Sequence, residues 1–188
     1  MCSNPPGQAI TASVYAGFCS VVTMKILVLS DSHSAIRFMR QCVDVINPQA
    51  IIHLGDYYDD AQTLGELYPH IELHHVPGNC DRYRCPPWVH PTLCYNVCGA
   101  RIYMTHGHKQ NVKTNTYMME AEARAMHAQA ALYGHTHVAD CRWTEDGMLV
   151  MNPGSAGYGG GSAGLLEVEN GKILSARILL PDDLAEYG

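Results

Sequence analysis

The chain has 188 residues and a formal net charge of −6 at pH 7. This length suits one domain with a sizeable core, because 47% of the residues are hydrophobic. The acidic balance, without any block of Lys and Arg, argues against an extended nucleic-acid surface, and the absence of a long apolar run argues against a membrane span.

Histidine and cysteine stand out in the composition. Eleven His exceed what this length ordinarily carries, and the excess indicates metal or acid–base chemistry. Eight Cys occur without a C-x-x-C pair, which excludes the zinc-ribbon and thioredoxin patterns. We therefore expect reduced thiols and a cytoplasmic protein.

The first 23 residues differ from the rest of the chain. They contain Pro5, Pro6 and Gly7 but no Lys, Arg, Asp or Glu, so the basic segment of a secretory signal is missing. We expect residues 1–23 to form a poorly ordered extension and residues 24–188 to form a single domain.

The first half of the domain alternates strands with helices. Its opening run is apolar and β-branched, as buried strands are, and Met39, Val43 and Ile46 then fall on one helical face. A β-α-β-α-β order predicts a parallel sheet with helices on its faces. The predicted elements are a strand over 25–30, a helix over 35–46, a strand over 50–54, a helix over 60–68 and a strand over 71–76.

The second half is richer in strands. Gly99-Ala100 and Asn170-Gly171 are turn signals that predict hairpins. Together the two halves predict an α/β fold, a four-layer α/β/β/α sandwich in which two mixed sheets pack face to face with helices outside. The predicted elements are strands over 93–98, 101–105, 130–133, 148–151, 165–169 and 173–179, and a helix over 116–127.

Side chains that bind metals recur where the predicted strands end, most of them beside a glycine. Asp31 and His33 are spaced i and i+2, which sends both to one side. Asp56 follows the neighbouring parallel strand, so it should lie near Asp31, and two close carboxylates repel unless a cation joins them. The seven candidate ligands are Asp31, His33, Asp56, Asn79, His106, His135 and His137.

Taken singly, these residues have structural interpretations as well. Asp31 suits a helix cap, whereas Asp56 and Asn79 suit turns. Two Asp, four His and one Asn are nevertheless too many ligands for one ion, and they suit a pair of ions that share a carboxylate. Two-metal centres are a common means of attacking a phosphate ester with water.

The motifs Asp31-x-His33, Gly55-Asp56, Gly78-Asn79, His106 and Gly134-His135-x-His137 resemble the signature of calcineurin-like metallophosphoesterases. The chain is further similar to the short YfcE-like phosphodiesterases, as judged from the motifs Leu54-Gly55-Asp56-Tyr57, Asn79-Cys80-Asp81 and Asn152-Pro153-Gly154-Ser155. The resemblance spans about residues 24–180.

The resemblance implies two divalent metal ions and a bridging hydroxide that attacks phosphorus in line. Nitrogen and oxygen donors suit Mn²⁺, our first expectation, and also Ni²⁺, Co²⁺, Fe²⁺ or Zn²⁺. In this scheme Asp31, His33 and His137 hold the first ion, Asn79, His106 and His135 hold the second, and Asp56 bridges the two.

Catalytic and substrate-binding roles involve four residues. Asp56 and Asn79 are catalytic candidates through the ions, and Asn79 and His108 are candidates for contacting substrate. Cys80 stands where many family members carry a His that could protonate the leaving group. A thiol with an ordinary pKa of about 8.5 is a poor replacement, so we expect His108 or a metal-bound water to serve instead.

A small phosphodiester is the expected substrate. A diester carries one charge, and only Lys109 and Lys113 stand close in sequence to a candidate ligand. The alternative is a non-catalytic protein-interaction scaffold on the same fold, similar to a subunit of retromer, for which we would expect missing ligands. A homo-oligomer is compatible with both interpretations.

Overall fold

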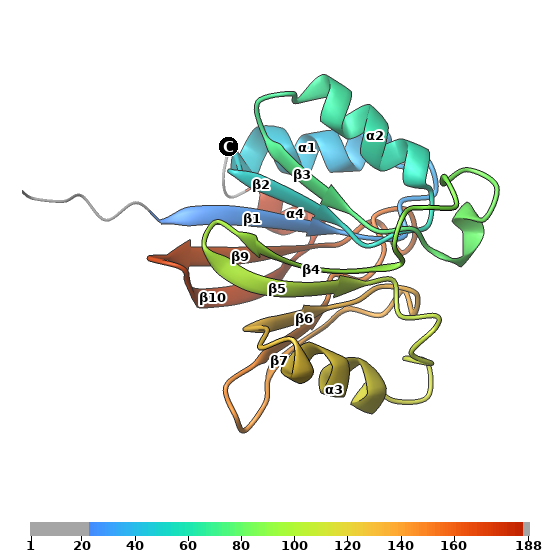
Figure 1. Ribbon diagram of the computed structural model, residues 1–188. Helices are drawn as coiled ribbons and strands as arrows, with labels where there is room; N and C mark the ends of the chain where they lie inside the picture. The colour runs from blue at the N-terminus through green and yellow to red at the C-terminus, as the bar shows by residue number, and fades with distance from the viewer. Residues whose placement is uncertain (1–22, 186–188) are drawn as a thin grey trace, which may run out of the picture.

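The structure is a computed structural model that describes residues 23–185. Two five-stranded sheets, each mixing parallel and antiparallel pairs, pack face to face, with helices on both outer faces (Figure 1). The predicted four-layer α/β/β/α sandwich is therefore confirmed. The expectation for the N-terminal extension falls almost entirely on residues 1–22, outside the described residues.

The first sheet has the strand order β10-β9-β1-β2-β3, in which β1, β2 and β3 run parallel. Its helices are α1, α2 and α4. The elements are β1 (Met24–Leu29), α1 (Ile36–Ile46), β2 (Ala50–His53), α2 (Tyr58–Leu67), β3 (Glu72–His75), β9 (Ala163–Glu169), β10 (Lys172–Leu179) and α4 (Pro181–Ala185).

The second sheet has the strand order β4-β5-β6-β8-β7, in which β5, β6 and β8 run parallel. A 3-10 turn, η1, lies in the connection from β3 to β4. The elements are η1 (Asn79–Asp81), β4 (Thr92–Val97), β5 (Ala100–Thr105), α3 (Tyr117–Ala125), β6 (Ala130–Leu132), β7 (Asp140–Trp143) and β8 (Leu149–Asn152).

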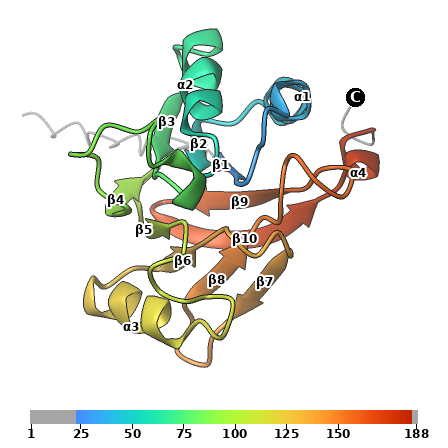
Figure 2. The same cartoon turned by 90° about the vertical axis from the view of Figure 1, so that its right-hand side faces the viewer.

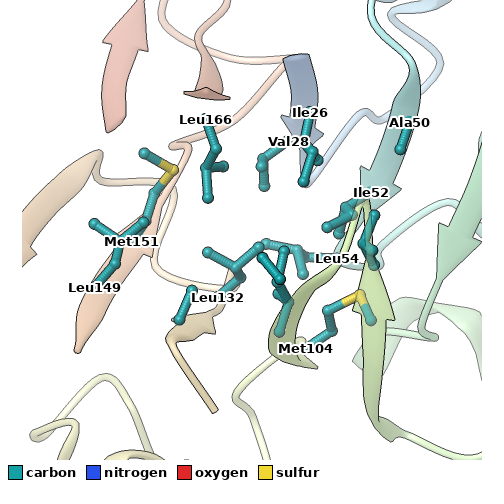
Figure 3. Packing of buried hydrophobic residues seen from close by; sticks show 14 of the residues in the cluster. Ile26, Val28, Ala50, Ile52, Leu54, Met104, Leu132, Leu149, Met151 and Leu166 are labelled. Atoms are coloured by element: carbon teal, nitrogen blue, oxygen red, sulfur yellow. The ribbon is translucent and has the colours of Figure 1, made fainter. Parts of the chain in front are cut away.

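Alternation along the buried strands builds the layers. In β1, Ile26 and Val28 enter the core between the two sheets, whereas Leu27 and Leu29 pack against the helix α1. Successive strand residues point to opposite faces, so one apolar run serves two clusters. Leu166 and Met151 belong to opposite sheets and meet in the inter-sheet core (Figure 3).

The second sheet repeats this arrangement with one helix. Ile102 in β5 faces the core between the sheets, while the next residue, Tyr103, packs on the other side with Met119 and Ala123 of α3. The sheets are thus held by one central cluster and flanked by two helix-side clusters, which places the parallel strands of both sheets in fixed relation.

Two tight turns join antiparallel strands as expected. The turn between β9 and β10 has φ of 51° at Asn170 and 73° at Gly171, the left-handed pair that a two-residue hairpin favours. The β4–β5 turn uses Cys98 and Gly99, at φ of 51° and 84°, rather than the predicted Gly99-Ala100, because Ala100 already pairs with Val97.

Besides the 3-10 turn η1, two short elements were not predicted. The strand β7 has four residues of mixed polarity at the sheet edge, and it is defined by pairing with β8 rather than by its own pattern. The helix α4 has five residues and starts at Pro181, which suits a first helical position. Local sequence carries little signal for either element.

The carboxyl ends of the central parallel strands gather at one edge of the sandwich. Loops that follow β1, β2, β3 and β5 lie at the right-hand end in Figure 1, and Figure 2 views the molecule from that side. No helix within residues 23–185 has the length and hydropathy needed to cross a membrane.

A buried histidine lies at the end of β2. The ring of His53 accepts from the backbone N–H of Gly55 through Nδ1, at 3.3 Å, so Nε2 carries the proton and faces the Ser32 hydroxyl at 3.2 Å. Burial, with smaller effects from His75 and His106, lowers the pKa of His53 to about 3. The folded state therefore needs a neutral ring.

This requirement predicts a pH-dependent stability of the metal-free protein. The unfolded ring binds a proton below its ordinary pKa of 6.5, whereas folded His53 does so only near pH 3, so stability falls as pH drops through this window. In urea unfolding, the free energy of unfolding of His53→Gln should fall less steeply with decreasing pH than that of the wild type, by about 1.4 kcal/mol per pH unit. The exposed control His70→Gln should keep the wild-type slope; an unchanged slope for His53→Gln would contradict this assignment.

Candidate metal centre

All seven predicted ligands lie at the carboxyl edge of the two sheets. Three loops of the first sheet, after β1, β2 and β3, supply the two aspartates, one histidine and the asparagine. Two loops of the second sheet, after β5 and β6, supply the remaining three histidines. The site therefore exists only where the two sheets meet.

One group of side chains surrounds the Asp31 carboxylate. Its members are Asp31, His33, Asp56 and His137, and one ligand atom from each lies within 4.8 Å of the others. The His137 Nε2 atom is 3.1 Å from Asp31 Oδ1, yet Asp31 Oδ1 and His33 Nε2 are both buried without a hydrogen-bond partner. Buried polar atoms normally have partners, so these two atoms are suited to hold a cation.

A second group surrounds the His106 ring. His106 Nδ1 is 2.9 Å from the carbonyl oxygen of Leu54, which can only accept, so Nδ1 carries the proton and Nε2 has a free lone pair. The Nε2 atom lies 3.1 Å from Asn79 Oδ1 and 3.5 Å from Asp56 Oδ1. These three atoms are all acceptors, so they cannot form hydrogen bonds with one another.

His135 completes this second group. Its ring centroid is 5.0 Å from that of His106. Its backbone N–H donates to Asp31 Oδ2 at 3.0 Å, so the same residue also fixes the orientation of the first group. Asp56 belongs to both groups, because it lies close to His106 and is a member of the Asp31 group.

The backbone at these positions is unusual. Left-handed φ values between 41° and 70° occur at five of the seven predicted ligands, although none of them is glycine. Such conformations are costly and persist where the surrounding structure enforces them, often at functional sites. The five residues are Asp31, His33, Asp56, His135 and His137.

Two glycines let the loops approach the carboxylates. A Cβ atom on Gly78 would lie 2.1 Å from Asp56 Oδ1, and one on Gly134 would lie 2.8 Å from Asp31 Oδ2. Neither distance is sterically allowed. The glycines beside the ligands therefore have a packing role that any larger residue would disrupt.

Burial and neighbouring charge perturb the titration of these groups in the metal-free chain. Burial, supported by Asp56, raises the pKa of Asp31 to about 6. Burial raises the pKa of Asp56 as well, but His106 and the N–H of Cys80 outweigh it and the net pKa falls. Burial lowers the pKa of His106 to about 4, so this ring is neutral at neutral pH, the form that binds metals.

The residues present fit divalent cations. Carboxylate, amide and imidazole acceptors converge from five loops, two of their atoms lack any partner, and the one ring whose tautomer is defined directs a lone pair inward. Cations would satisfy these groups, which hydrogen bonds within the chain do not. The assignment of each individual ligand stays a prediction.

His108 and Cys80 lie beside the centre. The His108 ring centroid is 5.5 Å from that of His106, and its Nδ1 atom is buried without a partner. The backbone N–H of Cys80 donates to Asp56 Oδ1 at 2.9 Å. Burial and the Asp56 carboxylate raise the pKa of the Cys80 thiol to about 11, which keeps it protonated and argues against a thiolate nucleophile.

The sequence alone does not reveal the role of Asp81. This carboxylate is fully buried and accepts four backbone N–H groups, from Asp56 (3.0 Å), Tyr57 (2.8 Å), Tyr58 (2.9 Å) and Gly78 (2.7 Å). It thereby joins the loop after β2 to the loop after β3 and positions both Asp56 and the loop that carries Asn79. The only available signal was its place two residues after the predicted ligand Asn79.

Aromatic rings form the rim of the centre. The His33 ring lies between Tyr57 and Tyr158, with centroid distances of 4.9 and 4.7 Å. Tyr158 also stacks on His137 at 5.2 Å. Tyr158 therefore belongs to the rim of this site.

The calcineurin-like phosphoesterase superfamily domain matches residues 24–171. Phosphodiesterase MJ0936 of Methanocaldococcus jannaschii is 27% identical over 165 residues, which cover 78% of this chain and 94% of that protein. The chain therefore belongs to the calcineurin-like phosphoesterase superfamily, and the predicted resemblance is confirmed. This membership also confirms the predicted class of enzyme, a hydrolase of phosphoric ester bonds.

Solved structures agree on the fold. A Streptococcus pneumoniae protein described as a predicted phosphoesterase superimposes with a TM-score of 0.69 at 24% identity, covering 87% of this chain and 92% of that one. Vacuolar protein sorting 29 of Cryptosporidium parvum superimposes with a TM-score of 0.65 at 15% identity, covering 84% and 97%. At these identities the comparisons establish the shared architecture.

The Asp81 interactions generate a prediction for metal binding. In Asp81→Asn an amide NH₂ replaces one oxygen and faces two backbone donors, so the loops carrying Asp56 and Asn79 should shift. We expect calorimetric titration to show Mn²⁺ affinity reduced by about 10–100-fold. The exposed control Asp182→Asn should bind as the wild type does. Unchanged Mn²⁺ affinity in Asp81→Asn would show that Asp81 stabilises the fold without positioning the ligands.

Proposed function

We propose that this chain is a phosphodiesterase that uses two divalent metal ions, with Mn²⁺ first and Ni²⁺, Co²⁺, Fe²⁺ and Zn²⁺ as alternatives. One ion would be held by Asp31, His33, Asp56 and His137, and the other by Asp56, Asn79, His106 and His135. When bound, such ions supply Lewis-acid activation of water and neutralise charge on the phosphoryl group.

The observation that carries the proposal is the position of the Asp56 carboxylate. It lies between two clusters of acceptor atoms, one around Asp31 and one around His106, and it is close to both. Because a carboxylate has two oxygens, it can serve two neighbouring cations at once. This placement supports a paired centre over a single ion.

The chain's own side chains have separate tasks in this scheme. Asp56 and His106 hold fixed positions through the N–H of Cys80 and the carbonyl of Leu54. His108 presents a buried, unpartnered nitrogen beside the centre, so we assign it a hydrogen bond to the leaving ester oxygen. Cys80 remains protonated and takes no nucleophilic part.

A diester suits the charges at the rim. Arg84 approaches the site over the Tyr57 ring, with 4.9 Å from its Cζ atom to the ring centroid, but its guanidinium pairs with Asp59 at 3.0 Å. Its charge is thus compensated at an exposed position. A monoester dianion would be better served by an arginine directed at the phosphate, so we favour the singly charged diester.

A scaffold is the second candidate function, because the fold resembles vacuolar protein sorting 29 over most of the chain. The complete set of seven donors favours catalysis, since a scaffold has no need for buried unpartnered acceptors. We also propose a small-molecule substrate, assembly with a second copy of the chain, and location in the cytoplasm. The six cysteines of the described residues are all free thiols, which is consistent with that compartment.

The proposal predicts metal-dependent hydrolysis with a preference for diesters. With Mn²⁺, kcat/KM for bis(p-nitrophenyl) phosphate should exceed that for p-nitrophenyl phosphate, because one negative charge matches the site. Release of p-nitrophenol, measured across Mn²⁺, Ni²⁺, Co²⁺ and Zn²⁺, gives both the preference and the best metal. A dominant monoester rate would reverse the substrate assignment.

The variant Asp56→Asn tests the bridging role of this carboxylate. The amide preserves the size of the side chain but removes the charge that both clusters share, so nearly all hydrolysis should be lost together with tight metal binding. Full activity in Asp56→Asn would refute the bridging role. Lack of hydrolysis by the wild type with every metal, together with stoichiometric binding of a partner protein, would favour the scaffold.

A further inference from the structure

A pocket of about 470 Å³ opens beside the metal centre. It lies between the β3–β4 connection, drawn in green at the right-hand end of Figure 1, and the loop that follows β5. Asn79 and His108 line the pocket and also lie at the metal centre, so the two spaces share a wall. The apolar lining consists of Pro77, Cys85, Pro86, Pro87, Val89 and Pro91.

The interior of the pocket offers few polar groups. Four prolines bring no backbone N–H, and burial raises the pKa of the Cys85 thiol, with a further contribution from Asp81, so the thiol is neutral. Asp81 also lines the pocket, but both of its oxygens already accept backbone N–H groups. Apart from His108 Nδ1, on the wall shared with the metal centre, an apolar ligand group would therefore leave no buried polar atom of this lining without a partner.

Two of the three charged residues that line the pocket are positive, and the third, Asp81, is fully buried with its oxygens accepting backbone N–H groups. Arg82 and Lys109 both line it. A cationic group, such as the trimethylammonium of choline, would meet like charge there, whereas a neutral ring would not. The pocket therefore combines apolar walls with a charge that disfavours cations. Such a pocket would bind a neutral apolar alcohol better than a cationic one.

We propose that this pocket binds the leaving alcohol of the phosphodiester and selects an apolar aromatic ring over a small or cationic group. The proposal rests on the proposed function, since it requires the phosphate to sit at the adjacent centre. His108 lies on the shared wall with an unpartnered Nδ1, where the ester oxygen between phosphate and ring would pass. Water adds to phosphorus, the bond from phosphorus to the alcohol oxygen breaks, and the alcohol departs with a proton derived from that water.

Two diesters that differ only in the leaving alcohol test the proposal. Methyl p-nitrophenyl phosphate releases an aromatic alcohol, and methyl 2,2,2-trifluoroethyl phosphate releases a small one. We expect Val89→Asp with Mn²⁺ to lower kcat/KM for the aromatic diester about tenfold more than for the other, because the ring meets a buried charge. The intrinsic reactivity of each diester is common to both proteins and cancels from this comparison.

Further variants separate selection from damage to the fold. Val89→Ser, which adds no charge, should shift the same ratio in the same direction by about threefold. Leu174→Asp, an equivalent change at an exposed position on β10, should leave the ratio at the wild-type value. An equal fall for both diesters in the Val89 variants, or no fall, would overturn the proposal and place the leaving alcohol elsewhere.

Failure of the proposed function has a different signature. If the wild type hydrolyses neither diester with any metal, the phosphodiesterase assignment fails, and the pocket is judged by binding of p-nitrophenol alone. Shifts of the backbone amide resonances of Arg82, Cys85 and Lys109 that Val89→Asp abolishes would support an aromatic-binding pocket. The absence of such shifts at millimolar p-nitrophenol would overturn it.

Discussion

The site depends on an electrostatic constraint at one carboxylate. His106 Nε2 lies 3.1 Å from Asn79 Oδ1 and 3.5 Å from Asp56 Oδ1, and none of these three atoms carries a proton. An unsatisfied buried polar group costs about 1–3 kcal/mol, and Asp31 Oδ1 and His33 Nε2 at the same edge are two such groups. A divalent cation would remove this penalty. The arrangement is therefore favourable as a metal site and unfavourable without a cation.

The scaffold enforces the arrangement against local preference. Left-handed conformations of non-glycine residues cost about 1–3 kcal/mol each, and five of the predicted ligands adopt them. Three apolar clusters hold the two sheets and their helices in register, while Asp81 joins the loops that follow β2 and β3. Strain at the strand ends is thus opposed by packing in the strands themselves.

The sequence indicated, for a clear physical reason, that several candidate ligand residues would lie at one edge of the sheet. Residues after parallel strands must meet at one edge, so Asp31, Asp56 and Asn79 could be placed together without coordinates. The same logic did not extend to Asp81, whose importance arises from four backbone N–H groups rather than from any pattern in the chain. Backbone geometry of this kind is invisible in a sequence.

Other features escaped prediction because they depend on distant parts of the chain. The strand β7 acquires its identity from β8, and the pocket beside the centre forms between two loops that only folding brings together. Tyr158 stacks on His137 at the rim, although the two residues lie far apart in the sequence. Local motifs thus indicated the candidate ligands, whereas the residues that surround and position them could not be predicted from the sequence.

Anomalous X-ray scattering from crystals grown with Mn²⁺, recorded at the manganese absorption edge, tests the central claim most directly. We expect two manganese peaks in each chain, with oxygens of the Asp56 carboxylate contacting both. A single peak, or peaks that this carboxylate does not touch, would contradict it.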